Sequence, residues 1–171
     1  TKNMINLKKI ISCILAIAVM SSFSVVLADG SADVYTEEVN ILKTLGIYSA
    51  QKNKNEAITQ KEFMQITAKI FGKDFDKKYY TQLGILPFSN GKYDEEESVP
   101  YYDALRAMVI ITGYDYFAKT GGGFPQGYLK IADECKITDG VKITDESAIT
   151  RAEAIKIVFN TLDVDMMVRA K

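Results

Sequence analysis

The chain has 171 residues, with 21 Lys and Arg against 22 Asp and Glu and a formal net charge of −1. This balance, without a basic stripe, argues against a nucleic-acid-binding protein. The sequence has no histidine, which excludes imidazole acid–base chemistry, histidine metal ligands and the Ser-His-Asp and Cys-His catalytic arrangements. No paired catalytic acids or metal-binding motif stands out, so we predict a protein that is not an enzyme and holds no metal or cofactor.

The first 28 residues have the pattern of an export signal. Lysines at positions 2, 8 and 9 precede an apolar run over residues 10–20, and Val26-Leu27-Ala28 suits cleavage after Ala28. The mature part, residues 29–171, would then carry 18 basic and 22 acidic residues, a formal charge of −4. We expect an exported protein of the cell wall, S-layer or cell surface. Two alternatives are an uncleaved membrane anchor and lipidation at Cys13.

Three segments of the mature part repeat one order of features. Each begins with apolar residues at helical i, i+1 and i+4 spacing, continues through a polar loop, and ends in the start of a second helix. We place the copies at about 33–72, 73–118 and 119–165. The apolar positions of the first helix are Ile41, Leu42 and Leu45; Tyr79, Tyr80 and Leu83; and Ile131, Ala132 and Cys135.

The second helix of each copy has a recognisable start. Thr59 with Glu62, and Thr150 with Glu153, have the spacing of capping boxes, while the middle copy has Pro100 at its start and an acid at Asp103. An amphipathic helix should follow, with one apolar face. The residues of that face are Met64, Thr67, Ala68 and Phe71; Leu105, Met108, Val109 and Thr112; and Ile155, Val158, Phe159 and Leu162.

These patterns predict an all-α fold of three helical hairpins packed together, because one such hairpin cannot bury its apolar face alone. Gly46 and Gly84 follow the first helices where a left-handed residue is needed, and Lys136 takes that place in the third copy at a conformational cost. We expect Cys135 to be a small buried hydrophobe. The acidic run 94–97 should be a solvated face rather than a calcium site, and Gly121-Gly122-Gly123 a flexible joint before the third copy.

The Leu-Gly-Ile ending of the first helix and the start Ile149-Thr150-Arg151-Ala152-Glu153 of the last one resemble the repeat of the S-layer homology (SLH) domain. The resemblance covers nearly all of residues 33–164. It implies three helical hairpins around a pseudo-threefold axis, which bind secondary cell-wall polysaccharide noncovalently in grooves between repeats. That polysaccharide is often anionic and pyruvylated, and a fused or associated surface protein is the expected cargo. The alternative function is a degenerate helical repeat used for protein–protein interaction or S-layer assembly.

Arg151 is the residue on which the predicted polysaccharide site depends. Its guanidinium offers a fork of donors to a carboxylate, and the N-terminus of a helix adds exposed N–H groups. The alternative is a solvated first-turn side chain. The resemblance extends the polysaccharide-binding set to the matching positions of the three copies, although the acids among them are expected to be helix caps first. The full set is Arg151, Thr150, Glu153, Gln60, Glu62, Tyr101 and Asp103. Gln60 and Tyr101 replace the arginine, and the chain lacks the tryptophan that the family often carries, so we expect one competent groove near Arg151.

Overall fold

The computed structural model describes residues 35–48 and 52–167. The chain divides into two compact units, Thr1–Asp33 and Val34–Lys171, and the predicted export signal over residues 1–28 lies outside the described residues. Every described core residue belongs to the second unit, so this unit has a hydrophobic core of its own. No helix within the described ranges has the length and apolar character needed to cross a membrane.

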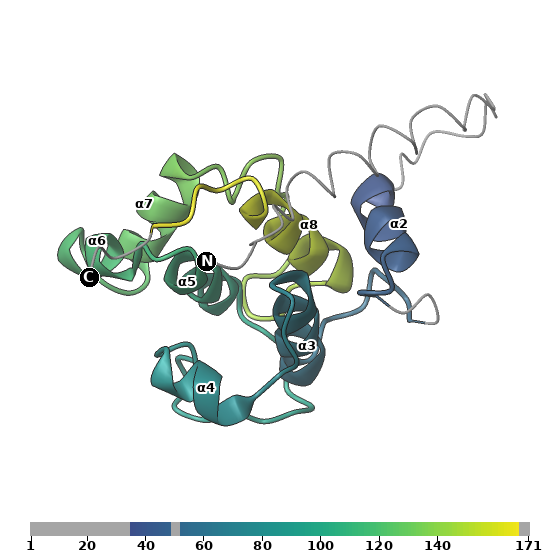
Figure 1. Ribbon diagram of the computed structural model, residues 1–171, viewed down its shortest axis with the longest axis horizontal. Coiled ribbons are helices and arrows are strands. Elements are labelled where there is room, and N and C mark those ends of the chain that lie inside the picture. The colour runs from purple at the N-terminus through teal and green to yellow at the C-terminus, as the bar shows by residue number, and fades with distance from the viewer. Residues whose placement is uncertain (1–34, 49–51, 168–171) are drawn as a thin grey trace, which may run out of the picture. The chain divides into compact units, whose positions relative to one another are not determined.

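The prediction of an all-α fold is confirmed, since the described part of the second unit contains helices and only isolated β-bridges (Figure 1). Six of the helices match the predicted first and second helices of the three copies. The remaining helix, α6, was not predicted and spans the predicted boundary between the second and third copies. The helices are α2 (Thr36–Thr44), α3 (Gln60–Ile70), α4 (Lys77–Gln82), α5 (Tyr101–Ile111), α6 (Asp115–Thr120), α7 (Gln126–Glu134) and α8 (Arg151–Thr161).

Two of the second helices begin with the predicted capping boxes. The Thr59 hydroxyl accepts the N–H of Glu62 at 3.3 Å, and the Thr150 hydroxyl accepts the N–H of Glu153 at 3.2 Å. In both cases the glutamate carboxylate accepts the N–H of the capping threonine in return. Pro100 caps α5 without a side-chain hydrogen bond. These caps fix the first turns of α3 and α8, which carry the candidate site residues.

The ends of the three first helices share one geometry. Gly46, Gly84 and Lys136 have φ values of 68°, 81° and 60°, which is the predicted left-handed conformation. In each copy the next residue donates its N–H to the carbonyl five positions earlier, the pattern of a Schellman cap. Lys136 is strained there because its Cβ disfavours this conformation, whereas glycine has none.

The core is built mainly by the second helices, whose predicted apolar faces are buried except for partial exposure of Phe71, Phe159 and Leu162. The prediction for the first helices was only partly right. Leu42, Tyr80 and Ala132 are buried, but the position three residues later is not. Leu83 is 37% exposed and Cys135 is half-buried, with burial raising the pKa of the Cys135 thiol.

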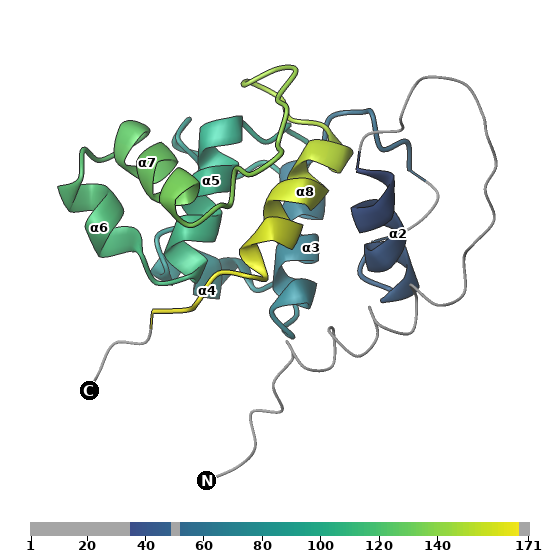
Figure 2. The ribbon, with the colours of Figure 1, turned by 90° about the horizontal axis from the view of Figure 1, so that it is seen from above.

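Two of the first helices pack against a helix from a different copy rather than completing a hairpin with the helix that follows them (Figure 2). Helix α2 lies against α8, where Lys156 and Glu38 form an ion pair of 2.7 Å. Helix α7 lies against α5. The second unit is therefore held together by contacts between segments distant in sequence.

Three buried residues close a ring of backbone hydrogen bonds at the centre of the second unit. Ile58 donates to the carbonyl of Ile149 at 3.0 Å, Ile149 donates to Val99 at 3.0 Å, and Val99 donates to Ile58 at 3.3 Å. All three side chains are fully buried. Each residue stands just before the cap of α3, α5 or α8, so the ring sets the starting points of these helices side by side.

The glycine-rich segment 121–123 is an ordered turn, which contradicts the prediction of a flexible joint. Gly123 donates its N–H to Ala118 at 3.0 Å, and α6 packs against α7. A Cβ on Gly127 would lie 2.0 Å from the carbonyl oxygen of Ala118. Only glycine permits this close approach of the two helices.

The acidic run 94–97 is paired with basic side chains and backbone donors. Glu95 accepts a 2.6 Å contact from Lys61, and Glu97 is in an ion pair with Lys92. The Asp94 carboxylate accepts the N–H of Glu96 at 3.1 Å. The run is largely exposed, as predicted.

Candidate functional site

The first residue of each second helix reaches into a loop of a different copy. We define the first loop as residues 52–56, the second loop as residues 94–98 and the third loop as residues 144–147. The three backbone N–H groups bond to these loops with nearly the same geometry. Arg151 donates to the carbonyl of Glu56 at 2.9 Å, Gln60 to Glu97 at 2.8 Å and Tyr101 to Glu146 at 2.8 Å.

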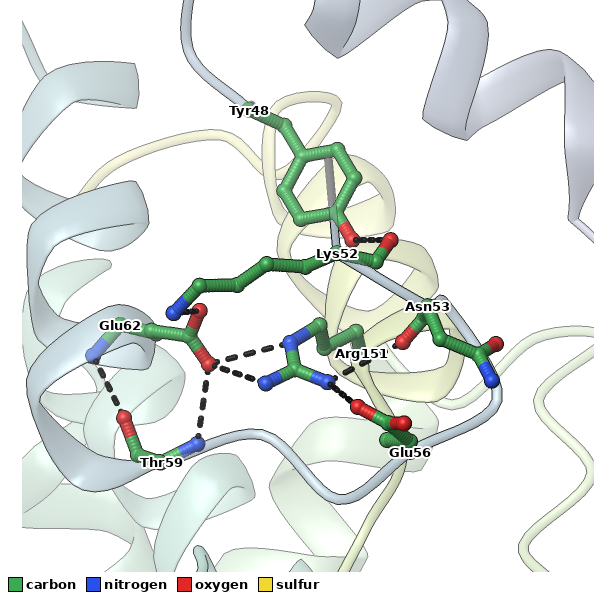
Figure 3. A network of polar contacts seen from close by, with 7 residues as sticks. All are labelled: Tyr48, Lys52, Asn53, Glu56, Thr59, Glu62 and Arg151. Carbon is green, nitrogen blue, oxygen red and sulfur yellow. Dashed lines mark hydrogen bonds and ion pairs between the residues drawn. The ribbon is translucent and has the colours of Figure 1, made fainter. Parts of the chain in front are cut away.

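The Arg151 guanidinium lies in a polar network between the start of α8 and the first loop (Figure 3). Its Nε and Nη2 atoms lie 3.1 and 3.0 Å from Oε2 of Glu62. Its Nη1 atom donates to Oε2 of Glu56 at 3.0 Å and to the carbonyl of Asn53 at 3.1 Å. Only 8% of the Arg151 side chain is exposed. The alternative of a solvated side chain is therefore wrong, and the guanidinium donors serve internal contacts.

Glu62 is the counter-ion at the centre of this network. Burial opposes ionisation of Glu62, but bonds from Lys52, Arg151 and the Thr59 N–H outweigh it and lower the pKa of the Glu62 carboxyl. Burial likewise disfavours the charged form of Arg151, and its bonds to Glu62 and Glu56 reverse the effect and raise its pKa. The network therefore holds both groups charged at neutral pH.

The N-terminus of α8 does not offer free N–H groups to a ligand. Arg151 and Ala152 donate to the first-loop carbonyls of Glu56 and Lys54, each at 2.9 Å. Glu153 donates to the Thr150 hydroxyl as part of the capping box. The expectation of exposed donors at this helix start was wrong, because the neighbouring loop already occupies them.

Gln60 occupies the matching place at the start of α3 and is fully buried. Its amide oxygen accepts the N–H of Asp94 at 3.0 Å, and its amide nitrogen lies 3.4 Å from the carbonyl of Ser98. The side chain therefore ties α3 to the second loop, as Arg151 ties α8 to the first.

Tyr101 occupies the same place at the start of α5 and is half-buried. Burial and the nearby charges of Asp133 and Glu146 raise the pKa of its phenol to about 12. Its ring lies 5.3 Å from that of Tyr102, whose hydroxyl donates to Glu146 of the third loop at 3.2 Å. Two adjacent tyrosines therefore line the contact between α5 and the third loop.

The acids at the third position of the second helices also have internal partners. Asp103 is fully buried, accepts the N–H of Ser89 at 2.9 Å and pairs with Arg106 at 3.0 Å. Glu153 accepts the N–H and hydroxyl of Thr144, each at 2.9 Å. The capping function predicted for Glu62 and Glu153 is confirmed, and each carboxylate also anchors another part of the chain. The same prediction for Asp103 was wrong, because Pro100 at the cap of α5 has no N–H to donate and the Asp103 carboxylate instead bonds Ser89 and Arg106.

From the predicted set, the structure brings Arg151 together with Glu62 and joins Thr150 to Glu153 in the capping box of α8. The other members, Gln60, Tyr101 and Asp103, lie at separate contacts. Sequence reasoning missed the partners Lys52, Asn53 and Glu56 because a polar loop has no periodic pattern to single them out. It also missed Ser89 and Thr144. No group of three or more cysteine and acidic residues suited to a metal ion occurs in ranges 35–48 and 52–167.

Comparisons of the chain with protein-family models, curated proteins and solved structures find no match.

Proposed function

We propose that the second unit is a non-catalytic, three-repeat module of the SLH type that anchors an exported protein to secondary cell-wall polysaccharide. The observation that carries the proposal is the closed ring of hydrogen bonds through Ile58, Val99 and Ile149. Each copy gives one donor and accepts one bond in this ring. That pattern supports three equivalent units around a pseudo-threefold axis, the arrangement that the SLH resemblance implies.

The starts of the second helices support the same arrangement. Arg151, Gln60 and Tyr101 each extend from one copy into a loop of the next, and the direction of these contacts runs once around the three copies. Under this proposal, Arg151 closes the contact between the third copy and the first. Arg151 then affects wall binding indirectly, by maintaining the fold of the module, and does not itself bind the anionic polysaccharide.

Tyr102 is the side chain that we propose to contact the polysaccharide. It lies at the junction of the second and third copies, half-buried, with one ring neighbour and a hydroxyl already oriented by Glu146. An aromatic ring that keeps one side in water can stack on the apolar face of a sugar while its hydroxyl stays hydrogen-bonded.

A second candidate function is protein–protein interaction by a degenerate repeat. The internal contacts of Arg151 favour this function. Its guanidinium already donates to Glu62 and Glu56, and these bonds would have to break before it could bind a glycan carboxylate. In that case the module would bind a surface protein and would not need the wall polymer.

Sedimentation with cell walls separates the two functions. Residues 29–171 should sediment with native walls and stay in solution with walls stripped of secondary polymer. Tyr102→Ala should weaken native-wall binding without lowering the melting temperature, whereas Tyr102→Phe, which keeps the ring, should bind nearly as the unchanged protein does. Equal sedimentation with native and stripped walls would reject polysaccharide anchoring and favour the second candidate.

A further inference from the structure

Of the six large apolar side chains exposed in the described part of the second unit, four lie on α6 and on the segment after α8, and the other two are Leu83 and Phe124. Tyr116 and Phe117 are 64% and 45% exposed, and Met166 and Met167 are 54% and 46% exposed. We call these four residues the apolar patch. Exposed apolar side chains that cluster, rather than scatter singly, commonly mark an interaction site on a protein surface.

Internal contacts join the two parts of the apolar patch. The Phe117 ring lies 6.3 Å from the ring of Tyr114, whose hydroxyl donates to the carbonyl of Asp165 at 3.2 Å. Met167 donates its N–H to the carbonyl of Thr112 at 2.9 Å. The segment that carries the methionines is therefore fixed beside the loop from which α6 begins.

We propose that the apolar patch is a self-association surface, at which one copy of this chain pairs with a second copy. Residues of opposite charge beside the apolar patch would allow two identical copies to pair. Asp115 and Lys119 on α6 form a 2.7 Å ion pair, and the Lys119 side chain is 65% exposed. When two α6 helices meet antiparallel across a twofold axis, Lys119 of each copy faces Asp115 of the other, so the apolar contact is flanked by matched charges.

The size of the apolar patch sets the strength of this pairing. Aromatic side chains bury about 150–250 Å² each when fully covered, so four half-exposed large side chains offer on the order of 400 Å² per copy. A stable interface usually covers about 800 Å² per partner, so the dimer should be weak and form only at high concentration. Molecules held close together on a surface reach such concentrations locally.

This pairing does not depend on polysaccharide binding. The apolar patch involves α6 and the segment after α8, whereas the proposed sugar contact involves Tyr102 at the start of α5. Changes in the apolar patch should therefore alter the oligomeric state in solution without altering the binding of the monomer to walls.

Sedimentation velocity over a wide concentration range tests the proposal on residues 29–171, which contain the whole second unit and its core. The unchanged protein should pass reversibly from monomer to dimer. Phe117→Ser should weaken association by about tenfold or more, the usual effect of losing a central aromatic residue. Leu83→Ser is the matched control, since Leu83 is an exposed apolar residue on α4's C-cap outside the patch, and it should leave association unchanged.

Lys119→Glu tests the charge pairing separately. It should weaken the dimer, and the remaining association should become stronger as salt rises, because screening reduces the new repulsion with Asp115 of the other copy. A monomer at every concentration overturns the proposal, as does a dimer that Phe117→Ser leaves intact. Equal weakening by Phe117→Ser and Leu83→Ser would also overturn it, because the association would then not be located at the apolar patch.

Discussion

Replacing Arg151 with alanine should destabilise the second unit rather than remove a surface contact. The change leaves Glu62, whose side chain is only 13% exposed, without the hydrogen bond and the ion-pair contact that the guanidinium makes, and leaves the Asn53 carbonyl without the Arg151 donor. Breaking a buried ion pair by removing one partner costs about 3–5 kcal/mol. Glu62 still keeps Lys52 and the Thr59 N–H, which lowers the expected cost.

The contribution of Glu56 to this cost is small. Its side chain is 64% exposed, so water can replace the lost guanidinium, and such a pair contributes about 0–1 kcal/mol. We therefore expect Arg151→Ala to lower the free energy of unfolding by about 2–3 kcal/mol. For a unit of this size that corresponds to a fall in melting temperature of roughly 10 °C.

Thermal and denaturant unfolding followed by circular dichroism measures this effect, with Lys61→Ala as the control. Lys61 pairs with Glu95 at the surface, so its removal should change the free energy of unfolding much less than Arg151→Ala does. A double-mutant cycle with Glu62→Gln should give a coupling energy of about 1–3 kcal/mol. An unchanged melting temperature in Arg151→Ala, combined with loss of wall binding, would refute the internal role derived for this residue.

The same network predicts the pH dependence of the effect. The pKa of Glu62 is lower in the folded protein than in the unfolded chain, so its stabilising contribution is complete above about pH 4.3, the unfolded value. That contribution is lost as the pH falls through the lower folded value. The difference in stability between the unchanged protein and Arg151→Ala should therefore shrink on acidification. A difference that stays constant down to pH 2 would contradict this assignment.

Three further changes test other parts of the structure. Glu153→Ala removes a capping acid and the bonds to Thr144, so it should cost about 1–2 kcal/mol in denaturant unfolding while wall binding is kept. Lys136→Gly should raise stability by about 1 kcal/mol in the same assay, because it relieves a left-handed residue at φ 60°, and Lys136→Ala should give no such gain. Gly127→Ala should cost about 2 kcal/mol or more, since its Cβ would overlap the Ala118 carbonyl, and a stable variant would show that α6 and α7 can move apart.

The helices and their ends could be predicted from the sequence because local chemistry decides them. The spacing of Thr150 and Glu153 specifies a capping box in any context, and the place of Lys136 directly after an apolar stripe specifies a left-handed cap. Helix α6 escaped prediction because its six residues are too few for apolar periodicity to reveal it and, unlike the equally short α4, it has no counterpart in the other copies.

The candidate site could not be predicted to the same degree because tertiary contacts decide it. A glutamine such as Gln60 is usually a surface residue, and only the second loop, folded against it, supplies the partners that allow complete burial. The same is true of Arg151, whose partners lie far away in the first part of the chain. An arginine at the start of a helix identified Arg151 as a candidate, but its tertiary neighbours determine that its guanidinium N–H groups face the protein interior.

If the second unit is the three-repeat module proposed above, the hydrogen-bond ring through Ile58, Val99 and Ile149 limits it to three copies. An open solenoid can gain or lose one unit at an end, since each unit contacts only its neighbours. A closed circuit has no end at which to add a unit, and deleting one leaves a buried N–H and a buried C=O without partners. Truncation before residue 149 should therefore unfold the whole assembly, whereas a circular permutant that keeps all three segments has every bond it needs.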